Sequence, residues 1–266
     1  MNMSIPEIFD RKARRIRRAR ATDVGFIAKT LAEDLFERLD MVQRVFARAL
    51  IVGPTPLLAS GLTMRAIAHE TYAGEEDRLD VGDGQFDLIL SSGTLDTVAD
   101  LPGALILMRR ALKPDGLLLA NFAGAPSLGA LRKAITAADG DKAVARLHPQ
   151  VDVRSAGDLL MRAGFALPVA DLDTMDVAYS NLGRLITDLR DAAANNALAT
   201  RYPVTRAWLA AADTAFSAQA DETGRTHETL SFVTLTAWAP APNQPQPARR
   251  GSARASLADA LRRPGD

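Results

Sequence analysis

FDLILSSGTLDTVADLPGALILMRRALKPDGLLLA, residues 86–120, contains two short apolar runs separated by a helical pattern. The runs Phe86 to Leu90 and Gly116 to Ala120 are typical of buried parallel strands. Asp100 is placed to cap the intervening helix, whose expected buried face is Leu101, Leu105, Met108 and Leu112. This order of strand, helix and strand predicts a βαβ unit, and therefore a parallel sheet covered by helices.

The sequence on either side extends the same pattern. The turn Lys113 to Gly116 contains a proline, which fixes φ, and a glycine, which is free to take a positive φ. Upstream, an amphipathic helix is predicted from Phe26 to about Asp40, and a buried strand from Ala49 to Val52 that ends at Gly53. Downstream, the run Leu230 to Trp238 is rich in β-formers and predicts a long late strand.

A helical insertion is predicted before that late strand. Ser155 with Asp158 resembles a capping pair for a helix that Gly164 ends, and a strand is expected from Phe165 to Val169. Asn181 can cap the next helix. We therefore expect an α/β fold with additional helices in the C-terminal half.

The composition limits the class of protein. Of 266 residues, 47% are apolar, which suffices for one main domain with a sizeable core. The 32 basic residues balance 32 acidic ones, so the net charge favours neither nucleic acid nor a membrane surface. The chain has no cysteine, which excludes disulfides, thiolate catalysis and thiolate metal sites. No apolar run approaches the roughly 20 residues that span a bilayer. The start lacks a secretory signal, so we expect a soluble cytoplasmic protein.

Other chemistries lack their motifs. The histidines His69, His148 and His227 have no second ligand at a helical spacing, so no metal site is predicted. The chain contains neither a GxSxG nucleophile turn nor a GxxxxGK[ST] phosphate loop.

The two ends of the chain differ from its middle. Residues 1–45 are predicted to be a helical cover, residues 46–239 the main domain, and residues 240–266 a linker and tail that can hold one short helix, Ala253 to Arg263. Seven of the ten residues from Arg11 to Arg20 are basic, beside a narrow apolar stripe of Ala13, Ile16 and Ala19. This basic face fits either a solvated surface or a docking surface for an acidic partner. Nucleic acid is disfavoured because no aromatic residues interleave the charges.

The unit from Phe86 to Ala120 resembles the fourth strand, following helix and fifth strand of class I S-adenosylmethionine-dependent methyltransferases. RAGFALPVADLDTMDVAYSNLGRLITDLRDAAANNAL, from Arg162 to Leu198, is similar to bacterial relatives of the mitochondrial complex I assembly factor that modifies an arginine. FDRKARRIRRARA from Phe9 and ARRGSARASLADAL from Ala248 are also similar to that group, and the malonyl-carrier-protein methyltransferase of biotin synthesis is its enzymatic cousin. The resemblance implies a Rossmann-like sheet of seven strands, with the last one antiparallel. It also implies that S-adenosylmethionine lies across the carboxyl ends of the first strands.

The turn after the first strand departs from the family pattern. The family has a glycine-rich GxGxG turn there, because a side chain would collide with the cofactor. Here the turn is GPTPL, residues 53–57, and its two prolines remove backbone donors. The resemblance assigns Gly53 and Thr55 to cofactor binding, whereas a tight turn without a ligand is the alternative.

The segment between the first and fourth family strands is too short for two further strands, so we expect one strand to be missing. The resemblance requires a carboxylate for the ribose hydroxyls. Glu70 is a candidate if the run Arg65 to Ala68 is the remaining second strand, whereas Glu75 and Glu76 align with the loop that reaches the adenine. The six acidic residues between Glu75 and Asp87 can equally form a solvated loop.

The segment after the fourth family strand begins at Ser91, which the resemblance places at the cofactor. Asp96 stands where relatives commonly carry a histidine, at a position that lines the site. It is the candidate for contacting a substrate nitrogen, such as that of a guanidinium, through a charge-assisted hydrogen bond. Capping of a turn is the alternative role for Asp96.

These observations leave two hypotheses. In the first, the protein is an S-adenosylmethionine-dependent transferase acting on a protein client in complex I assembly, with Asp96 facing the substrate. In the second, the domain has lost the cofactor and is a scaffold that holds a client through the Arg11 to Arg20 face and the tail. An enzyme needs an open crevice at the end of the first strand, whereas a scaffold can let Leu57, Leu58 and Leu62 collapse into it.

Overall fold

The computed structural model describes residues 7–21, 25–53, 55–142 and 144–244. Residues 245–252 of the predicted linker and the predicted helix Ala253 to Arg263 lie outside these ranges, as does Pro54. The proposed limits of the three segments, 1–45, 46–239 and 240–266, stay a prediction.

The described residues form one six-stranded sheet in the order β2-β1-β3-β4-β6-β5. Its strands are β1 (Arg48–Val52), β2 (Ala68–Tyr72), β3 (Phe86–Ser92), β4 (Leu112–Ala123), β5 (Ala166–Tyr179) and β6 (Thr226–Trp238). The first four strands pair in parallel, and β6 runs antiparallel to both β4 and β5. The predicted α/β fold, with a mostly parallel sheet of one strand fewer than seven, is confirmed.

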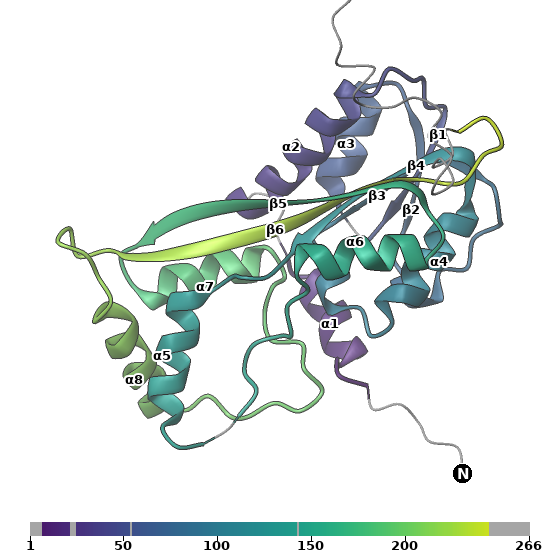
Figure 1. The fold of residues 1–266 in the computed structure, drawn as a ribbon. Helices are drawn as coiled ribbons and strands as arrows, with labels where there is room; N and C mark the ends of the chain where they lie inside the picture. The colour runs from purple at the N-terminus through teal and green to yellow at the C-terminus, as the bar shows by residue number, and fades with distance from the viewer. Residues whose placement is uncertain (1–6, 22–24, 54, 143, 245–266) are drawn as a thin grey trace, which may run out of the picture.

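Helices cover both faces of the sheet (Figure 1). The α-helices are α1 (Arg11–Arg18), α2 (Phe26–Met41), α3 (Pro56–Met64), α4 (Leu101–Ala111), α5 (Gly129–Asp139), α6 (Val153–Arg162), α7 (Leu182–Asp191) and α8 (Arg206–Ser217). Two short 3₁₀ helices are η1 (Glu76–Arg78) and η2 (Leu95–Thr97). Helices α2 and α3 lie on one face of the sheet, and α4 and α6 lie on the other.

The core on the α2 and α3 side is built from leucines of the helices and strands. Leu58 and Leu62 of α3 are fully buried and pack in one cluster with Leu88 and Leu90 of β3. Leu57 packs against the same cluster. These leucines therefore pack against the sheet and do not collapse into a crevice at the end of β1.

The predicted helical insertion packs beneath the overhanging parts of β5 and β6, where α5, α7 and α8 lie together (Figure 1). Glu228 of β6 ties this part to the sheet, because its carboxylate accepts hydrogen bonds from the amides of Ala130 (3.1 Å) and Leu131 (2.7 Å) in the first turn of α5. Phe216 of α8 is fully buried in this cluster.

The sequence correctly predicted the N-caps of α4 and α7. It was wrong about the N-cap of α6 and about the residue with positive φ in the turn 113–116. The side chains of Asp100 and Asn181 cap α4 and α7 as predicted. The positive φ in the 113–116 turn belongs to Asp115 (+63°) and not to Gly116, where an added Cβ would lie 2.9 Å from a backbone oxygen. Helix α6 is capped by Asp152, three residues before Ser155, because the Asp152 carboxylate accepts from both the amide and the hydroxyl of Ser155.

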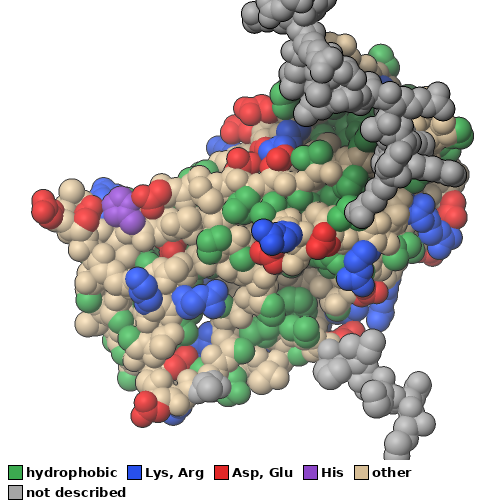
Figure 2. All heavy atoms as spheres, in the orientation of Figure 1, with side chains coloured by type: hydrophobic (Ala, Val, Ile, Leu, Met, Phe, Trp, Pro, Cys, Tyr) green, Lys and Arg blue, Asp and Glu red, His purple; other side chains and the backbone are tan. Residues whose placement is uncertain are grey.

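The outer surface of β5 carries exposed apolar side chains. Leu167 and Val169 are 49% and 48% exposed. Figure 2 shows hydrophobic side chains interspersed with charges of both signs on the face that β5 and α6 present. No helix among the described residues is long and apolar enough to cross a membrane.

Candidate functional site

The chain reverses its winding between β1 and β3, which pair with each other while β2 pairs on the other side of β1. Ligands of open α/β sheets bind outside the carboxyl ends of the strands at such a point. Gly53, directly after β1, has a φ of +101°, and a Cβ added to it would lie 2.6 Å from Cγ2 of Thr94. The turns after β1 and β3 therefore touch, and glycine is required at position 53.

A shallow hollow lies at these strand ends. We call it the strand-end hollow; its lining includes Thr55, Ser92, Gly93, Thr94 and Arg18. Of the predicted cofactor residues, Gly53 adjoins it and Thr55 lines it. Ser91 is fully buried behind it, where its hydroxyl lies 3.0 Å from that of Thr94.

Glu70 lies elsewhere. The second strand is Ala68–Tyr72 and not Arg65 to Ala68, so Glu70 sits in the middle of an edge strand, opposite Leu50. Its exposed carboxylate binds Arg48 at the start of β1, at 2.5 and 3.1 Å. The prediction that Glu70 ends the second strand at the crevice is wrong, because its side chain reaches toward the opposite end of β1.

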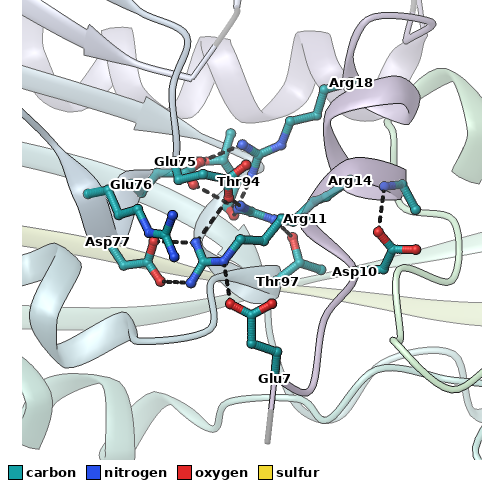
Figure 3. Close-up of polar contacts among 12 residues, drawn as sticks. Glu7, Asp10, Arg11, Arg14, Arg18, Glu75, Glu76, Asp77, Thr94 and Thr97 are labelled. Carbon is teal, nitrogen blue, oxygen red and sulfur yellow. Dashed lines mark hydrogen bonds and ion pairs between the residues drawn. The ribbon is translucent and has the colours of Figure 1, made fainter. Parts of the chain in front are cut away.

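The acidic residues that follow β2 are paired with α1. We call Glu75, Glu76 and Asp77 the acidic loop. Figure 3 shows arginines of α1 pointing into this loop. Arg11 binds both oxygens of Asp77, at 2.6 and 2.7 Å. This hydrogen bonding lowers the pKa of the Asp77 carboxyl and raises the pKa of Arg11.

Arg14 and Arg18 enclose Glu76, which is fully buried. Arg14 donates to one Glu76 oxygen at 2.9 Å, and Arg18 donates to the other at 2.6 Å. Both guanidinium groups also donate to the carbonyl oxygen of Thr94, each at 2.9 Å. Arg14 completes its contacts with Glu75 and with the Thr97 hydroxyl, at 2.9 and 2.8 Å.

Three of the seven basic residues predicted as a solvated or docking face, Arg11, Arg14 and Arg18, therefore make an internal contact, whereas Lys12, Arg15 and Arg20 are exposed. Arg14 is 4% exposed, whereas Ile16 of the predicted apolar stripe is 39% exposed. Of the six acidic residues predicted to form a solvated loop, the three of the acidic loop bind α1, whereas Asp80 and Asp83 are exposed. The signal for this pairing was the spacing of Arg11, Arg14 and Arg18, which places three cations on one side of a helix.

A larger pocket lies next to the strand-end hollow. We call it the Asp96 pocket; it holds about 1050 Å³ of space, part of it open to solvent, and apolar side chains such as Ile27, Leu128 and Phe232 form much of its wall. Asp96, from η2, lines it as predicted. Burial raises the pKa of Asp96 to about 6, although Arg18 and Arg14 act in the opposite direction. No described side chain donates a hydrogen bond to this carboxylate; its one donor is the amide of Asp96 itself, and Glu76 repels it through space.

The other polar groups in the wall of the Asp96 pocket already have partners. Nε2 of His148 accepts a hydrogen bond from the amide of Ala197 at 2.6 Å, and burial, then Arg17 and Arg14, lowers the pKa of His148 to about 4. Gln150 exchanges two hydrogen bonds of 3.1 Å with the backbone of Ser127. His148 and Gln150 were not predicted, because only the fold brings residues 146–150 to this wall.

Arg18 stands between the two spaces, because it lines both the strand-end hollow and the Asp96 pocket. Leu31 and Gly93 also line both. The molecule thus has two adjoining cavities at the carboxyl ends of its strands, separated by a guanidinium group of α1.

Comparisons with known proteins agree with this arrangement. The family model of a methyltransferase domain matches residues 55–120. The arginine-hydroxylase NDUFAF5 of Danio rerio is 30% identical over 247 residues, which cover 90% of this chain and 74% of that protein. Malonyl-[acyl-carrier protein] O-methyltransferase 1 of Coxiella burnetii is 31% identical over 196 residues, which cover 66% of this chain and 67% of that protein.

A solved structure from Bacillus halodurans, named as a methyltransferase, has the same fold. It matches with a TM-score of 0.52 at 14% identity, over 79% of this chain and 99% of that one. A parallel sheet with ligand space at its switch point, together with these relatives, defines the class of protein. The chain belongs to the class I S-adenosylmethionine-dependent methyltransferase family. Within that family it is similar to NDUFAF5 and to the malonyl-carrier-protein methyltransferases.

Proposed function

We propose that this protein is an S-adenosylmethionine-dependent transferase whose substrate is an arginine side chain of a protein client in the assembly of respiratory complex I. The carrying observation is the Asp96 carboxylate, which lines the pocket beside the strand-end hollow and receives no hydrogen bond from the described side chains. The arginines in the same wall, Arg14, Arg18 and Arg146, are already paired with other carboxylates. The Asp96 carboxylate is half-buried and its one hydrogen bond comes from its own backbone amide, so acceptor capacity remains for a cation that supplies two parallel N–H donors.

An arginine side chain suits the shape of the Asp96 pocket as well as its charge. Its methylene stem can lie against Ile27, Leu128 and Phe232, while its planar head meets a carboxylate that accepts two bonds. Support comes also from the relative in Danio rerio, which is named an arginine-hydroxylase. The client, its place in complex I assembly and a cytoplasmic location remain parts of the proposal.

The residues at the strand ends fit the amino-acid half of S-adenosylmethionine better than its nucleoside half. The strand-end hollow offers Thr55, Ser92 and the guanidinium of Arg18, which suit an amino-acid carboxylate and ammonium. For the ribose, Glu76 of the acidic loop is enclosed by Arg14 and Arg18, whereas Glu75 is bound through one oxygen only, by Arg14 and Arg11. The bound cofactor would supply an electrophilic methyl group; the protein would supply position and orientation.

The second candidate function is a scaffold without catalysis. It is favoured by the same ion pairs between α1 and the acidic loop, which close the nucleoside side of the crevice. In that case the client would be held by exposed residues such as Lys12 and Arg15 of α1 and by the tail, and the strand ends would bind nothing.

Calorimetric titration with a guanidinium probe tests the substrate proposal. The probe is Nα-acetyl-arginine methylamide, and its neutral isostere, the citrulline analogue, is the control ligand. We expect the arginine probe to bind and the citrulline probe not to bind. Asp96→Asn should weaken arginine binding by about tenfold or more, because a charged hydrogen-bonded pair is lost.

Asp100→Asn is the matched control variant, because Asp100 is exposed and lies four residues further along the same segment. Its side chain caps α4 by accepting from the amide of Gly103, and the asparagine oxygen can accept the same hydrogen bond. This variant should bind the arginine probe as the wild type does. Equal affinities of the wild type and Asp96→Asn for this probe would overturn the role given to Asp96. Binding of both probes with one affinity would overturn the choice of arginine.

A further inference from the structure

The arginines of α1 cover the acidic loop, which follows the carboxyl end of β2 (Figure 3). We infer that α1 is a latch: its docking on the acidic loop and the binding of a nucleoside ligand at the strand ends exclude each other. This inference concerns regulation of the site described above and rests on the proposed function, since it presumes that the crevice receives such a ligand.

The first argument is that Glu76 is fully buried beneath two arginines of α1. A ribose presents two vicinal hydroxyl donors, and a carboxylate with two free oxygens is the side chain that accepts both. In Glu76 one oxygen is taken by Arg14 and the other by Arg18. The Thr94 carbonyl at the same edge receives both guanidinium groups. A nucleoside can reach these acceptors only if the arginines leave them.

The second argument is how α1 is held. Arg14 is the one buried residue of α1, all of which the structure describes. No side chain of α1 belongs to an apolar core cluster of the described residues. Ion pairs that lose their hydration gain little net free energy, so a helix held by them exchanges more readily than one anchored by leucines. The opposite side of α1 is exposed at Lys12, Arg15 and Ile16.

The third argument is the anchor that remains when α1 moves. Phe9 is 6% exposed and pairs as an isolated bridge with Leu198, and the amide of Asp10 donates to the carbonyl of Ala197 at 2.8 Å. The segment before α1 is therefore fixed to the body independently of the arginines. Movement of Arg18 away from Glu76 would also join the strand-end hollow to the Asp96 pocket, because Arg18 lines both.

The test is calorimetry on the full chain with S-adenosylhomocysteine as the probe. The variant Arg14→Ala with Arg18→Ala releases the acceptors, and Arg15→Ala with Arg20→Ala removes two exposed arginines from the same segment as a control. If docking of α1 competes with the ligand, the Arg14→Ala, Arg18→Ala variant binds S-adenosylhomocysteine at least about tenfold more tightly than the wild type. The reason is that a larger fraction of its chains has the strand ends open. The control stays within about twofold of the wild type.

Amide hydrogen exchange on the wild type gives a second readout that needs no variant. Saturating S-adenosylhomocysteine should speed exchange of residues 11–18, because the latch opens. Slower exchange there would overturn the inference, since α1 would then close on the ligand. If the released variant does not melt cooperatively, the exchange result alone decides.

The outcomes separate the latch from the proposed transferase. Equal affinity in all forms overturns the latch and leaves the transferase standing. If S-adenosylhomocysteine binds neither the wild type nor the folded Arg14→Ala, Arg18→Ala variant, both the latch and the transferase are overturned. Titration with the arginine probe then still tests the role of Asp96 separately.

Discussion

Gly53 shows how much of the family turn survives at a single residue. Its φ of +101° and the contact with Thr94 demand glycine, whereas the following prolines depart from the family pattern. The requirement at this position was predictable from the sequence. The reason, contact with a neighbouring turn in the protein itself, was not predictable.

Gly53→Ala should destabilise the protein more than Gly84→Ala. Both glycines have a positive φ, but a Cβ at Gly84 meets no atom within 4 Å, whereas one at Gly53 meets Thr94 at 2.6 Å. Denaturant unfolding should give a loss of about 1 to 2 kcal/mol for Gly84→Ala from backbone strain. The loss for Gly53→Ala should be larger by about 1 to 3 kcal/mol from overpacking. Thr94→Ser should recover part of the second loss; equal losses would show that the contact is absent.

Asp96→Asn should stabilise the protein at neutral pH and not in acid. Burial raises the pKa of Asp96 to about 6, from an ordinary value of 3.8. The folded chain therefore holds this proton to a higher pH than the unfolded chain does. The contribution of Asp96 to stability is fully present below pH 4 and is lost as the pH rises through 6. Melting curves should show a gain of about 2 kcal/mol for Asp96→Asn at pH 7.5 and almost none at pH 4. A gain that does not change with pH would contradict the buried carboxylate.

Helix α1 is the element that the sequence pattern misjudged. The helix was predictable from its spacing, but its basic face was taken as solvated or as a docking surface for a partner. Burial of Arg14 reverses that assignment, because its partners Glu75 and Glu76 lie some sixty positions away in the sequence. Amphipathic patterns assume that apolar residues face inward, and paired charges are the exception.

A double-mutant cycle at Arg14 and Glu76 measures this contact. Arg14→Ala should cost about 3 to 5 kcal/mol in the free energy of unfolding, because it leaves a buried carboxylate short of a partner. Arg15→Ala, on the exposed side of α1, should cost less than about 0.5 kcal/mol. Combining Arg14→Ala with Glu76→Ala should cost less than the sum of the single changes. Strict additivity would mean that the two side chains do not interact.

Strands β5 and β6 are longer than their apolar runs. The sequence predicted Phe165 to Val169 and Leu230 to Trp238, whereas the strands extend to Tyr179 and begin at Thr226. The added residues, such as Asp171 and Asp173, are polar because this part of β5 is largely open to solvent. These residues are part of β5 because they pair with β6. No local sequence pattern reveals this pairing.

At the scale of the whole molecule, the sequence predicted the sheet, its missing strand and the position of Asp96. It did not predict the two adjoining cavities, because their walls combine α1, η2 and residues 146–150 and 192–197. Glu70 was misplaced for a related reason: with a strand missing, the end of the second strand had to be guessed from a short run of mixed residues.

The most direct test of the transferase account is titration of the wild-type chain with S-adenosylmethionine by calorimetry, paired with a thermal melt. The account predicts binding of one ligand per chain below millimolar concentration and a rise in melting temperature, because a ligand that binds only the folded state stabilises it. No heat and no shift at millimolar ligand would contradict the account and leave the scaffold as the function of this fold.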